Sequence, residues 1–309
     1  MDTSLEQLDS AIQNKDSESL MSLISYKTNS QRIKLREEYK TTFSRDLFED
    51  FKKSFKGEFL QTIIGIFKTP VEYDVDLLNN SLKGFSIDKD VISEIICFRT
   101  PKRLEQIKVK YQEKYGENLV EKLKKETSGG YQKIIINLLE GNRNQNDKPD
   151  LETCSNIADE IYKAGEGKIG TNEEVFIKYF TTLSKEEILM VCQEYHRKYS
   201  KTMLDVLHNE FYGTDKKLLE DILYSIFSPS EYFAREIMDS IKGLGTNNNK
   251  LIRCIVSRYN YDMKLIKKYF KKIYQKTLLE EVKDDVSGSY GKILELLIDK
   301  HDNSEALPQ

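Results

Sequence analysis

One unit of sequence occurs four times along this chain of 309 residues. Its first marker is a glycine inside an apolar segment, which recurs at intervals of 72, 84 and 75 residues as Gly57, Gly129, Gly213 and Gly288. Its second marker is a pair of aromatic residues four positions apart, which recurs at the same intervals as Tyr39/Phe43, Tyr111/Tyr115, Tyr195/Tyr199 and Phe270/Tyr274. Solenoid repeats have shorter periods of about 20–50 residues. We therefore predict four small domains built on one unit of about 70–75 residues.

Each copy of the unit is predicted to be helical. In the fourth copy, apolar residues recur every three or four positions and predict five helices, close to 229–241, 251–258, 263–273, 278–286 and 290–298. No segment shows the apolar–polar alternation that is typical of a strand. The chain holds only 5 Pro and 15 Gly, so few residues oppose helix formation. The predicted fold class is all-α, with four units of five helices.

Proline and one polar stretch mark the breaks between copies. K-T-P at 68–70 and F-S-P at 227–229 predict two breaks, and G-N-R-N-Q-N-D-K-P-D at 141–150 predicts a flexible linker. The predicted division has copies at 1–69, 70–141, 152–228 and 229–300, a linker at 142–151 and a disordered tail at 301–309.

Charge and cysteine usage narrow the class of protein. The net charge of −3 lacks the basic excess of a general nucleic-acid binder, so we expect no nucleic-acid partner. The N-terminal M-D-T-S-L-E-Q lacks the apolar region of a secretion signal. The cysteines show no metal-binding spacing and are predicted to be reduced; they are Cys97, Cys154, Cys192 and Cys254. These features predict a cytoplasmic protein.

The sequence contains no convincing motif for a cofactor-binding or catalytic site. G-E-G-K-I-G at 165–170 satisfies the glycine pattern of a dinucleotide site, but the segment before it is predicted to be a helix and not the required strand. His196, His208 and His301 form no pattern with a nucleophile. We therefore expect that the protein is not an enzyme.

A loop residue and a distant carboxylate recur at a fixed spacing. The fourth copy carries the glycine loop I-K-G-L-G-T at 241–246, and related loops precede the corresponding acids of two other copies. An interval of 40 residues separates the members of three pairs: Gly245 and Asp285, Gly170 and Glu210, and Ser86 and Glu126. Such repetition predicts one kind of ion site present several times.

The chemistry of these loops suits calcium. Calcium takes about 6–8 oxygen ligands, including backbone carbonyls and bidentate carboxylates, and glycine allows a tight turn to aim successive carbonyls outward. In the fourth copy the predicted ligands are the carbonyls of Ile241, Gly243 and Gly245 with the side chain of Asp285. In the third they are the carbonyls of Gly165, Lys168 and Gly170 with the side chain of Glu210.

Over nearly its full length the chain resembles an annexin. The motifs that carry the resemblance are K-G-L-G-T-N-N-N-K-L-I-R-C-I-V-S-R and D-D-V-S-G-S-Y in the fourth copy, A-G-E-G-K-I-G-T-N-E-E-V-F in the third, and C-F-R-T-P and E-T-S-G-G-Y in the second. The resemblance implies a curved disc of four five-helix repeats with calcium loops on its convex face. It also implies reversible, calcium-dependent binding to acidic phospholipid membranes.

Two copies depart from the annexin pattern. The first has A-I-Q-N-K-D-S-E-S-L in place of the glycine loop and Ser54 in place of the carboxylate, so its site is predicted to be lost. The second has a weakened set made of Leu82, Gly84, Ser86 and Glu126, with Ile87 where the family has threonine. Serine resists a positive φ at a cost of about 1 kcal/mol. Such loops resemble those of divergent protist annexins, the giardins among them.

Apolar residues at the loop tips are candidates for membrane contact. Leu244 and Ile169 each come just before the last glycine of a loop, and Phe85 holds the equivalent place in the second copy. Incidental exposure of an apolar side chain is the alternative.

Other partners stay open at this point. Lys267, Lys268, Lys271 and Lys272 could bind a glycosaminoglycan, or they could form a solvated helix face. The alternative function is a structural scaffold on the cytoskeleton in which calcium is secondary.

Overall fold

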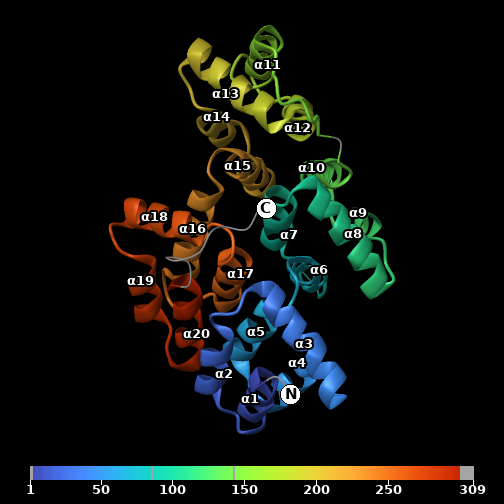
Figure 1. Ribbon diagram of the computed structural model, residues 1–309. Coiled ribbons are helices and arrows are strands. Elements are labelled where there is room, and N and C mark those ends of the chain that lie inside the picture. The colour runs from blue at the N-terminus through green and yellow to red at the C-terminus, as the bar shows by residue number, and fades with distance from the viewer. Residues whose placement is uncertain (1–2, 85, 142, 300–309) are drawn as a thin grey trace. The chain divides into compact units, whose positions relative to one another are not determined.

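The computed structural model describes residues 3–84, 86–141 and 143–299, and these form twenty α-helices with no strand (Figure 1). The first copy holds α1 (Thr3–Gln13), α2 (Ser17–Ile24), α3 (Asn29–Phe43), α4 (Leu47–Ser54) and α5 (Gly57–Ile66). The second holds α6 (Pro70–Ser81), α7 (Lys89–Phe98), α8 (Pro101–Tyr115), α9 (Leu119–Glu126) and α10 (Gly129–Leu139). The third holds α11 (Leu151–Ala164), α12 (Glu173–Thr182), α13 (Lys185–Tyr199), α14 (Met203–Glu210) and α15 (Gly213–Phe227). The fourth holds α16 (Pro229–Ile241), α17 (Asn248–Arg258), α18 (Met263–Tyr274), α19 (Leu278–Asp285) and α20 (Gly288–Asp299). The all-α prediction is confirmed.

The recurring glycine is the first residue of the fifth helix in every copy. Gly57, Gly129, Gly213 and Gly288 have φ angles of 61°, 70°, 59° and 65°. This left-handed conformation costs little only for glycine, because glycine has no Cβ. The glycine therefore turns the chain from the fourth helix into the fifth, which explains its strict recurrence.

The recurring aromatic pair lies on the third helix of every copy. The centroids of the paired rings are 4.9, 5.1, 5.0 and 4.9 Å apart in the four copies. The first ring of each pair is fully buried; these rings belong to Tyr39, Tyr111, Tyr195 and Phe270. Residues four apart lie on the same face of a helix, so the pair covers one stripe of the core in each copy.

The helices of the fourth copy follow the predicted spans closely. The largest difference is at α17, which begins at Asn248 rather than at the first apolar residue, Leu251. The Asn247 side chain accepts a hydrogen bond from the backbone N–H of Lys250 and caps this helix. Apolar periodicity detects the buried face of a helix and misses a polar first turn.

The described part of the predicted linker is tied to the third copy by hydrogen bonds. Arg143 donates to the backbone carbonyls of Phe180 and Leu183, at 2.9 and 3.2 Å. Asn144 donates to the Glu187 carboxylate at 3.0 Å. The predicted tail, 301–309, lies outside the described residues.

The chain forms two compact units, Met1–Tyr73 with Ser230–Gln309, and Asp74–Pro229. In the first unit, α5 packs on α17 and α20, and α2 packs on α20 (Figure 1). In the second unit the corresponding helices pair in the same way, α10 with α12 and α15, and α7 with α15. Each unit thus joins two copies through their second and fifth helices. Among the described residues, no helix combines the length and apolar character needed to span a bilayer.

Gly65 allows close packing of α5 in the first unit. A Cβ at this position would lie 3.1 Å from both Val256 of α17 and Tyr73. That distance is tighter than ordinary van der Waals contact, so a larger residue would force the Val256 or Tyr73 side chain to shift.

Candidate calcium sites

The loop between the first and second helices is closed by the same backbone hydrogen bond in all four copies. A backbone N–H at the start of the second helix donates to a carbonyl near the end of the first. The bond joins Asp16 to Ala11, Asp88 to Ser81, Asn172 to Ala164 and Asn247 to Ser240, with N–O distances of 2.8, 2.9, 2.7 and 2.7 Å. The first copy encloses the shortest segment, in agreement with its missing glycine loop.

In the fourth copy a threonine joins the loop to the predicted carboxylate. Gly243 and Gly245 have positive φ angles of 119° and 88°. Asp285 is the last residue of α19, and its Oδ2 accepts a hydrogen bond of 2.6 Å from the Thr246 hydroxyl. The structure therefore brings together the loop and the carboxylate that are 40 residues apart in the sequence.

The third copy repeats this arrangement. Gly170 has a φ of 77°, and the Thr171 hydroxyl donates to Oε2 of Glu210, the last residue of α14. A Cβ on Gly165 would come within 3.1 Å of Cδ of Glu210, so the loop passes close to the carboxylate at this glycine. The Gly165 carbonyl accepts a hydrogen bond of 3.0 Å from the Lys168 N–H. A carbonyl oxygen has two lone pairs, so one stays available to a cation.

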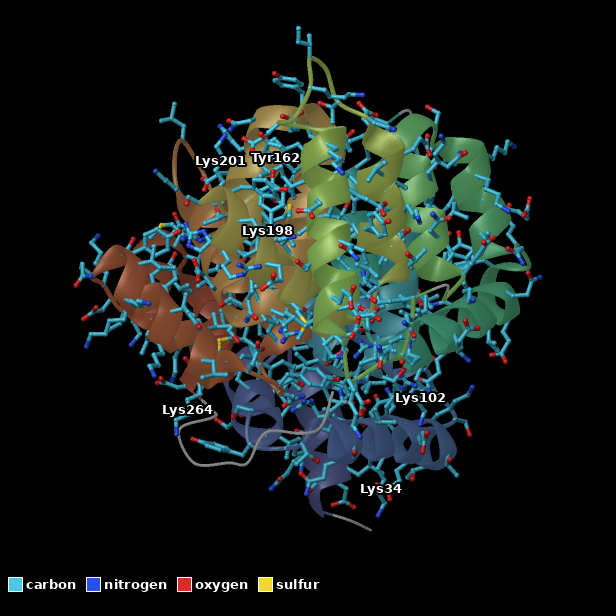
Figure 2. All side chains as sticks on the ribbon, turned by 90° about the horizontal axis from the view of Figure 1, so that it is seen from above. Lys34, Lys102, Tyr162, Lys198, Lys201 and Lys264 are labelled. Atoms are coloured by element: carbon cyan, nitrogen blue, oxygen red, sulfur yellow. The ribbon has the colours of Figure 1, made fainter. Side chains whose placement is uncertain are left out.

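Glu166 anchors the third loop to the helices below it. Its carboxylate accepts a hydrogen bond of 2.9 Å from the Tyr195 hydroxyl and also pairs with Lys201. Burial and this hydrogen bond raise the pKa of Tyr195, and the bond to Glu166 raises the pKa of Lys201. In Figure 2 the loop projects beyond the helices at the top of the view, above the labelled Lys201 and Tyr162. We infer that Glu166 holds the loop in place.

The second copy lacks the link between loop and carboxylate. Gly84 keeps a positive φ of 98°, but Ile87 has no hydroxyl to donate to Glu126. Glu126 instead lies 3.6 Å from the Lys122 ammonium, measured between Oε1 and Nζ. Phe85, predicted at the tip of this loop, lies outside the described residues. A cation at this loop would have to compete with Lys122 for the carboxylate.

The first copy uses its loop acid for another purpose. The Asp16 side chain accepts hydrogen bonds from the N–H groups of Glu18 and Ser19, both at 3.1 Å, and so caps α2. Ser54 ends α4 at the position of the missing carboxylate. This copy therefore lacks both the glycine loop and the carboxylate that form the predicted calcium sites of the third and fourth copies.

The donors of the third and fourth loops fit calcium. Within 3–84, 86–141 and 143–299 there is no group of three or more His, Cys, Asp or Glu side chains placed to hold a metal. Beside each of the two loops the fourth helix places one predicted ligand carboxylate, Glu210 or Asp285, so the other protein ligands would be backbone carbonyls. An all-oxygen set of this kind suits a hard cation with flexible geometry, as Ca²⁺ is.

Three interactions at these loops were not predicted from the sequence. They are the threonine–carboxylate hydrogen bonds, the contacts of Glu166 with Tyr195 and Lys201, and the Lys122–Glu126 ion pair. A G-T dipeptide closes the third and fourth loops but is absent from the second, and this was the available signal for the threonines. Lys122 and Glu126 are four residues apart on a helix, a spacing that allows an ion pair. The spacing alone could not show that Glu126, the acid expected to bind a cation, forms this pair in the folded protein.

The lysine-rich α18 carries no acidic residue. Its five lysines are Lys264, Lys267, Lys268, Lys271 and Lys272. The third helices of the other copies mix the two signs of charge; Glu37, Glu105 and Glu194 are examples. A glycosaminoglycan partner for this helix stays a prediction.

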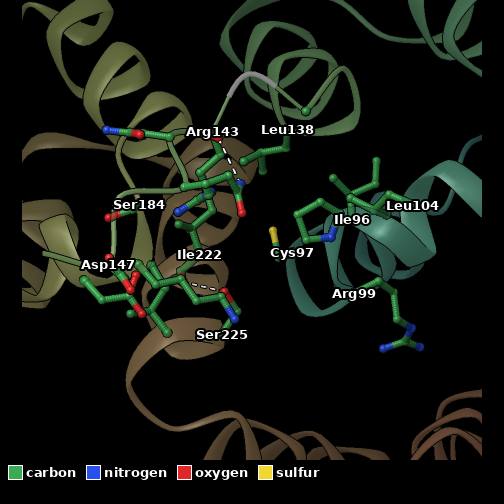
Figure 3. A pocket seen from close by; sticks show the side chains of 17 residues that line it. Ile96, Cys97, Arg99, Leu104, Leu138, Arg143, Asp147, Ser184, Ile222 and Ser225 are labelled. Atoms are coloured by element: carbon green, nitrogen blue, oxygen red, sulfur yellow. Dashed lines mark hydrogen bonds between the residues drawn. The ribbon is translucent and has the colours of Figure 1, made fainter. Parts of the chain in front are cut away.

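A cavity of about 330 Å³ in the second unit is unrelated to the loops (Figure 3). Apolar residues such as Ile96 and Leu104 line it, together with Cys97 and Arg143. Burial, together with the charge of Asp221, raises the pKa of the Cys97 thiol well above its usual value. The thiolate is the reactive form of cysteine, so the chemistry of this cavity does not favour nucleophilic attack.

Known proteins share both the sequence pattern and the fold. A model of the annexin family matches residues 4–66, 73–138, 157–222 and 232–297. Annexin A4 of Homo sapiens is 35% identical over 282 residues, which cover 91% of this chain and 88% of that protein. Annexin A5 of Mus musculus is 36% identical over 288 residues, which cover 93% and 90%.

Solved structures agree with the sequence relatives. Annexin III superposes with a TM-score of 0.92 and 28% identity, covering 96% of this chain and 92% of that one. Chicken annexin V in complex with Zn²⁺ gives 0.90 and 32%, covering 96% and 94%. Calcium-bound α-14 giardin gives 0.82 at 18% identity, covering 95% and 98%, and so shares the fold alone. The resemblance stated from the sequence is confirmed: the chain belongs to the annexin family.

Proposed function

We propose that this chain binds acidic phospholipid membranes when Ca²⁺ joins its loop carbonyls to lipid phosphates. Annexins bind Ca²⁺ and, in its presence, phospholipid. The observation that supports this function most strongly is the threonine–carboxylate link, because it places an acid beside a glycine loop in two copies. We infer a cytoplasmic protein that associates reversibly with the membrane.

The third and fourth copies provide the ligands of this proposal. The fourth would use the carbonyls of Ile241, Gly243 and Gly245 with the carboxylate of Asp285, and the third those of Gly165, Lys168 and Gly170 with that of Glu210. Bound calcium would supply positive charge at the contact with the phosphates. With a net charge of −3, the chain itself offers little overall attraction to an acidic surface.

The loop tips favour insertion of side chains into the bilayer surface. Ile169 and Leu244 have relative exposures of 104% and 109%, so neither packs on the protein. Full burial of such a side chain in an apolar environment contributes about 1.5–3 kcal/mol, and shallow insertion contributes part of that. These side chains would strengthen a contact that calcium has already oriented.

Co-sedimentation with vesicles tests the proposed function. The protein should pellet with phosphatidylserine-containing vesicles in calcium, return to the supernatant with a chelator, and pellet poorly with phosphatidylcholine vesicles. A parallel assay with cytoskeletal filaments examines the scaffold alternative. Filament binding without vesicle binding would contradict the proposal.

Carboxylate variants should rank the sites. Asp285→Asn and Glu210→Gln remove one charge with little change in shape, and each should raise the calcium concentration for half-maximal vesicle binding by at least about tenfold. Glu126→Gln is the matched control and should have a much smaller effect, because Lys122 engages that acid. The measurement is a calcium titration of vesicle binding. If Glu126→Gln were the most damaging variant, the ranking would be wrong.

A further inference from the structure

Tyr212 is an exposed aromatic residue close to the third loop. Its side chain is 82% exposed, and its hydroxyl makes no hydrogen bond with the described part of the chain. It follows Glu210 by two residues in the turn between α14 and α15. Since Glu210 accepts a hydrogen bond from Thr171 at the end of the loop, this turn and the loop are directly connected.

The backbone around Tyr212 directs its side chain away from the core. Phe211 and Tyr212 both have extended backbones, with φ/ψ of −123°/157° and −133°/160°. Successive side chains of an extended segment point to opposite sides. Phe211 is buried, with its ring 5.0 Å from that of Phe176 in an edge-to-face contact. Tyr212 therefore points outward.

The fold does not require an aromatic residue at this position. The equivalent residues before the marker glycine are Lys56, Ser128 and Ser287 in the other copies. Lys56 and Ser128 have the same extended backbone as Tyr212. The side chains of Lys56, Ser128 and Tyr212 make no capping hydrogen bond to the helix that follows each of them. The third copy alone places a large ring here, where the other copies have a polar side chain.

A tyrosine in this position has the chemistry of a membrane interface. Its ring is apolar and its hydroxyl is polar, and such side chains concentrate at the level of the lipid headgroups. We propose that Tyr212 enters the interfacial region of an acidic bilayer beside the third loop. The third copy then contacts the membrane with two side chains, Ile169 and Tyr212. This inference rests on the proposed function.

A single tryptophan reports on this contact, because the chain contains none. In the Tyr212→Trp variant, calcium and vesicles with brominated acyl chains should quench the fluorescence and shift it to shorter wavelength. Tyr26→Trp is the matched control, since Tyr26 is 81% exposed but lies beyond the C-terminal end of α2, at the opposite end of that helix from its loop. Its fluorescence should stay unquenched.

Retention on vesicles provides a second measurement. Tyr212→Ser should increase the rate of dissociation from vesicles at least about threefold while leaving the lipid-free calcium affinity unchanged, and Tyr212→Phe should retain most of the wild-type behaviour. Equal dissociation rates for the wild type and Tyr212→Ser would count against the inference.

The outcomes separate this inference from the proposed function. If the wild type pellets with acidic vesicles in calcium but Tyr212→Trp is not quenched, Tyr212 does not enter the bilayer and the proposed function stands. Quenching that persists in chelator would also overturn the inference, because the contact would not depend on the loop. If the wild type does not pellet at all, the proposed function itself fails.

Discussion

Millimolar Ca²⁺ should raise the melting temperature of the wild-type protein, and the Glu210→Gln/Asp285→Asn double variant should lose most of this increase. A ligand that binds only the native state stabilises it by mass action, by about 2.7 kcal/mol when its concentration is one hundred times Kd. For a unit of this size that corresponds to about 5–10 °C. Each compact unit contains one of the two carboxylates, so both units should respond.

Differential scanning calorimetry with and without calcium measures this effect. Glu126→Gln provides the control, since it removes a carboxylate of the same helix position while leaving both threonine-linked loops intact. The single variants should each lose part of the increase. A wild-type melting temperature that does not move in millimolar calcium would contradict calcium binding to the native state. An undiminished increase in the double variant would show that the ions bind elsewhere.

The repeat itself was predictable because local constraints recur in the sequence. A positive φ at the start of the fifth helix admits glycine with little strain, so Gly57, Gly129, Gly213 and Gly288 had to recur in register. The buried aromatic stripe on the third helix recurs for a similar reason, since its rings fill the same part of each core. Both signals report on backbone conformation or burial within one copy.

The pairing of copies was not predictable in this way. The contact of α5 with α17 joins residues nearly two hundred positions apart. Apolar periodicity shows that each helix has a buried face, but it does not identify the helix that covers that face. Gly65 was a weak signal of this contact. Glycine inside a helix is unfavourable and often marks close packing, and at Gly65 the Val256 side chain of α17 approaches α5 closely.

The candidate sites were predictable in their positions and not in their mutual contacts. The 40-residue interval paired each loop with one acid, and in the third and fourth copies the structure places that acid against its loop. The ion pair of Glu126 and the outward direction of Tyr212 depend on side-chain geometry after folding. The difference between an acid bonded to its loop and an acid paired with a lysine therefore appears only in the structure.

Calcium and acidic lipid should bind this protein cooperatively. Loop carbonyls and one carboxylate leave part of the calcium shell to water, and phosphate oxygens can take those positions. Linkage is reciprocal, so lipid must raise calcium affinity by the factor by which calcium raises lipid affinity. We expect the apparent calcium Kd to fall at least about tenfold between lipid-free protein and vesicles rich in phosphatidylserine.

Calcium titration at several phosphatidylserine densities is the measurement that decides this mechanism. The apparent affinity should rise with density in the wild type, and the rise should be smaller in Asp285→Asn and Glu210→Gln, which weaken the bridging ions. Phosphatidylcholine vesicles control for lipid surface without acidic charge. An apparent calcium affinity that stays constant across all densities would rule out bridging, because phosphate oxygens that complete the calcium shell must stabilise the bound ion.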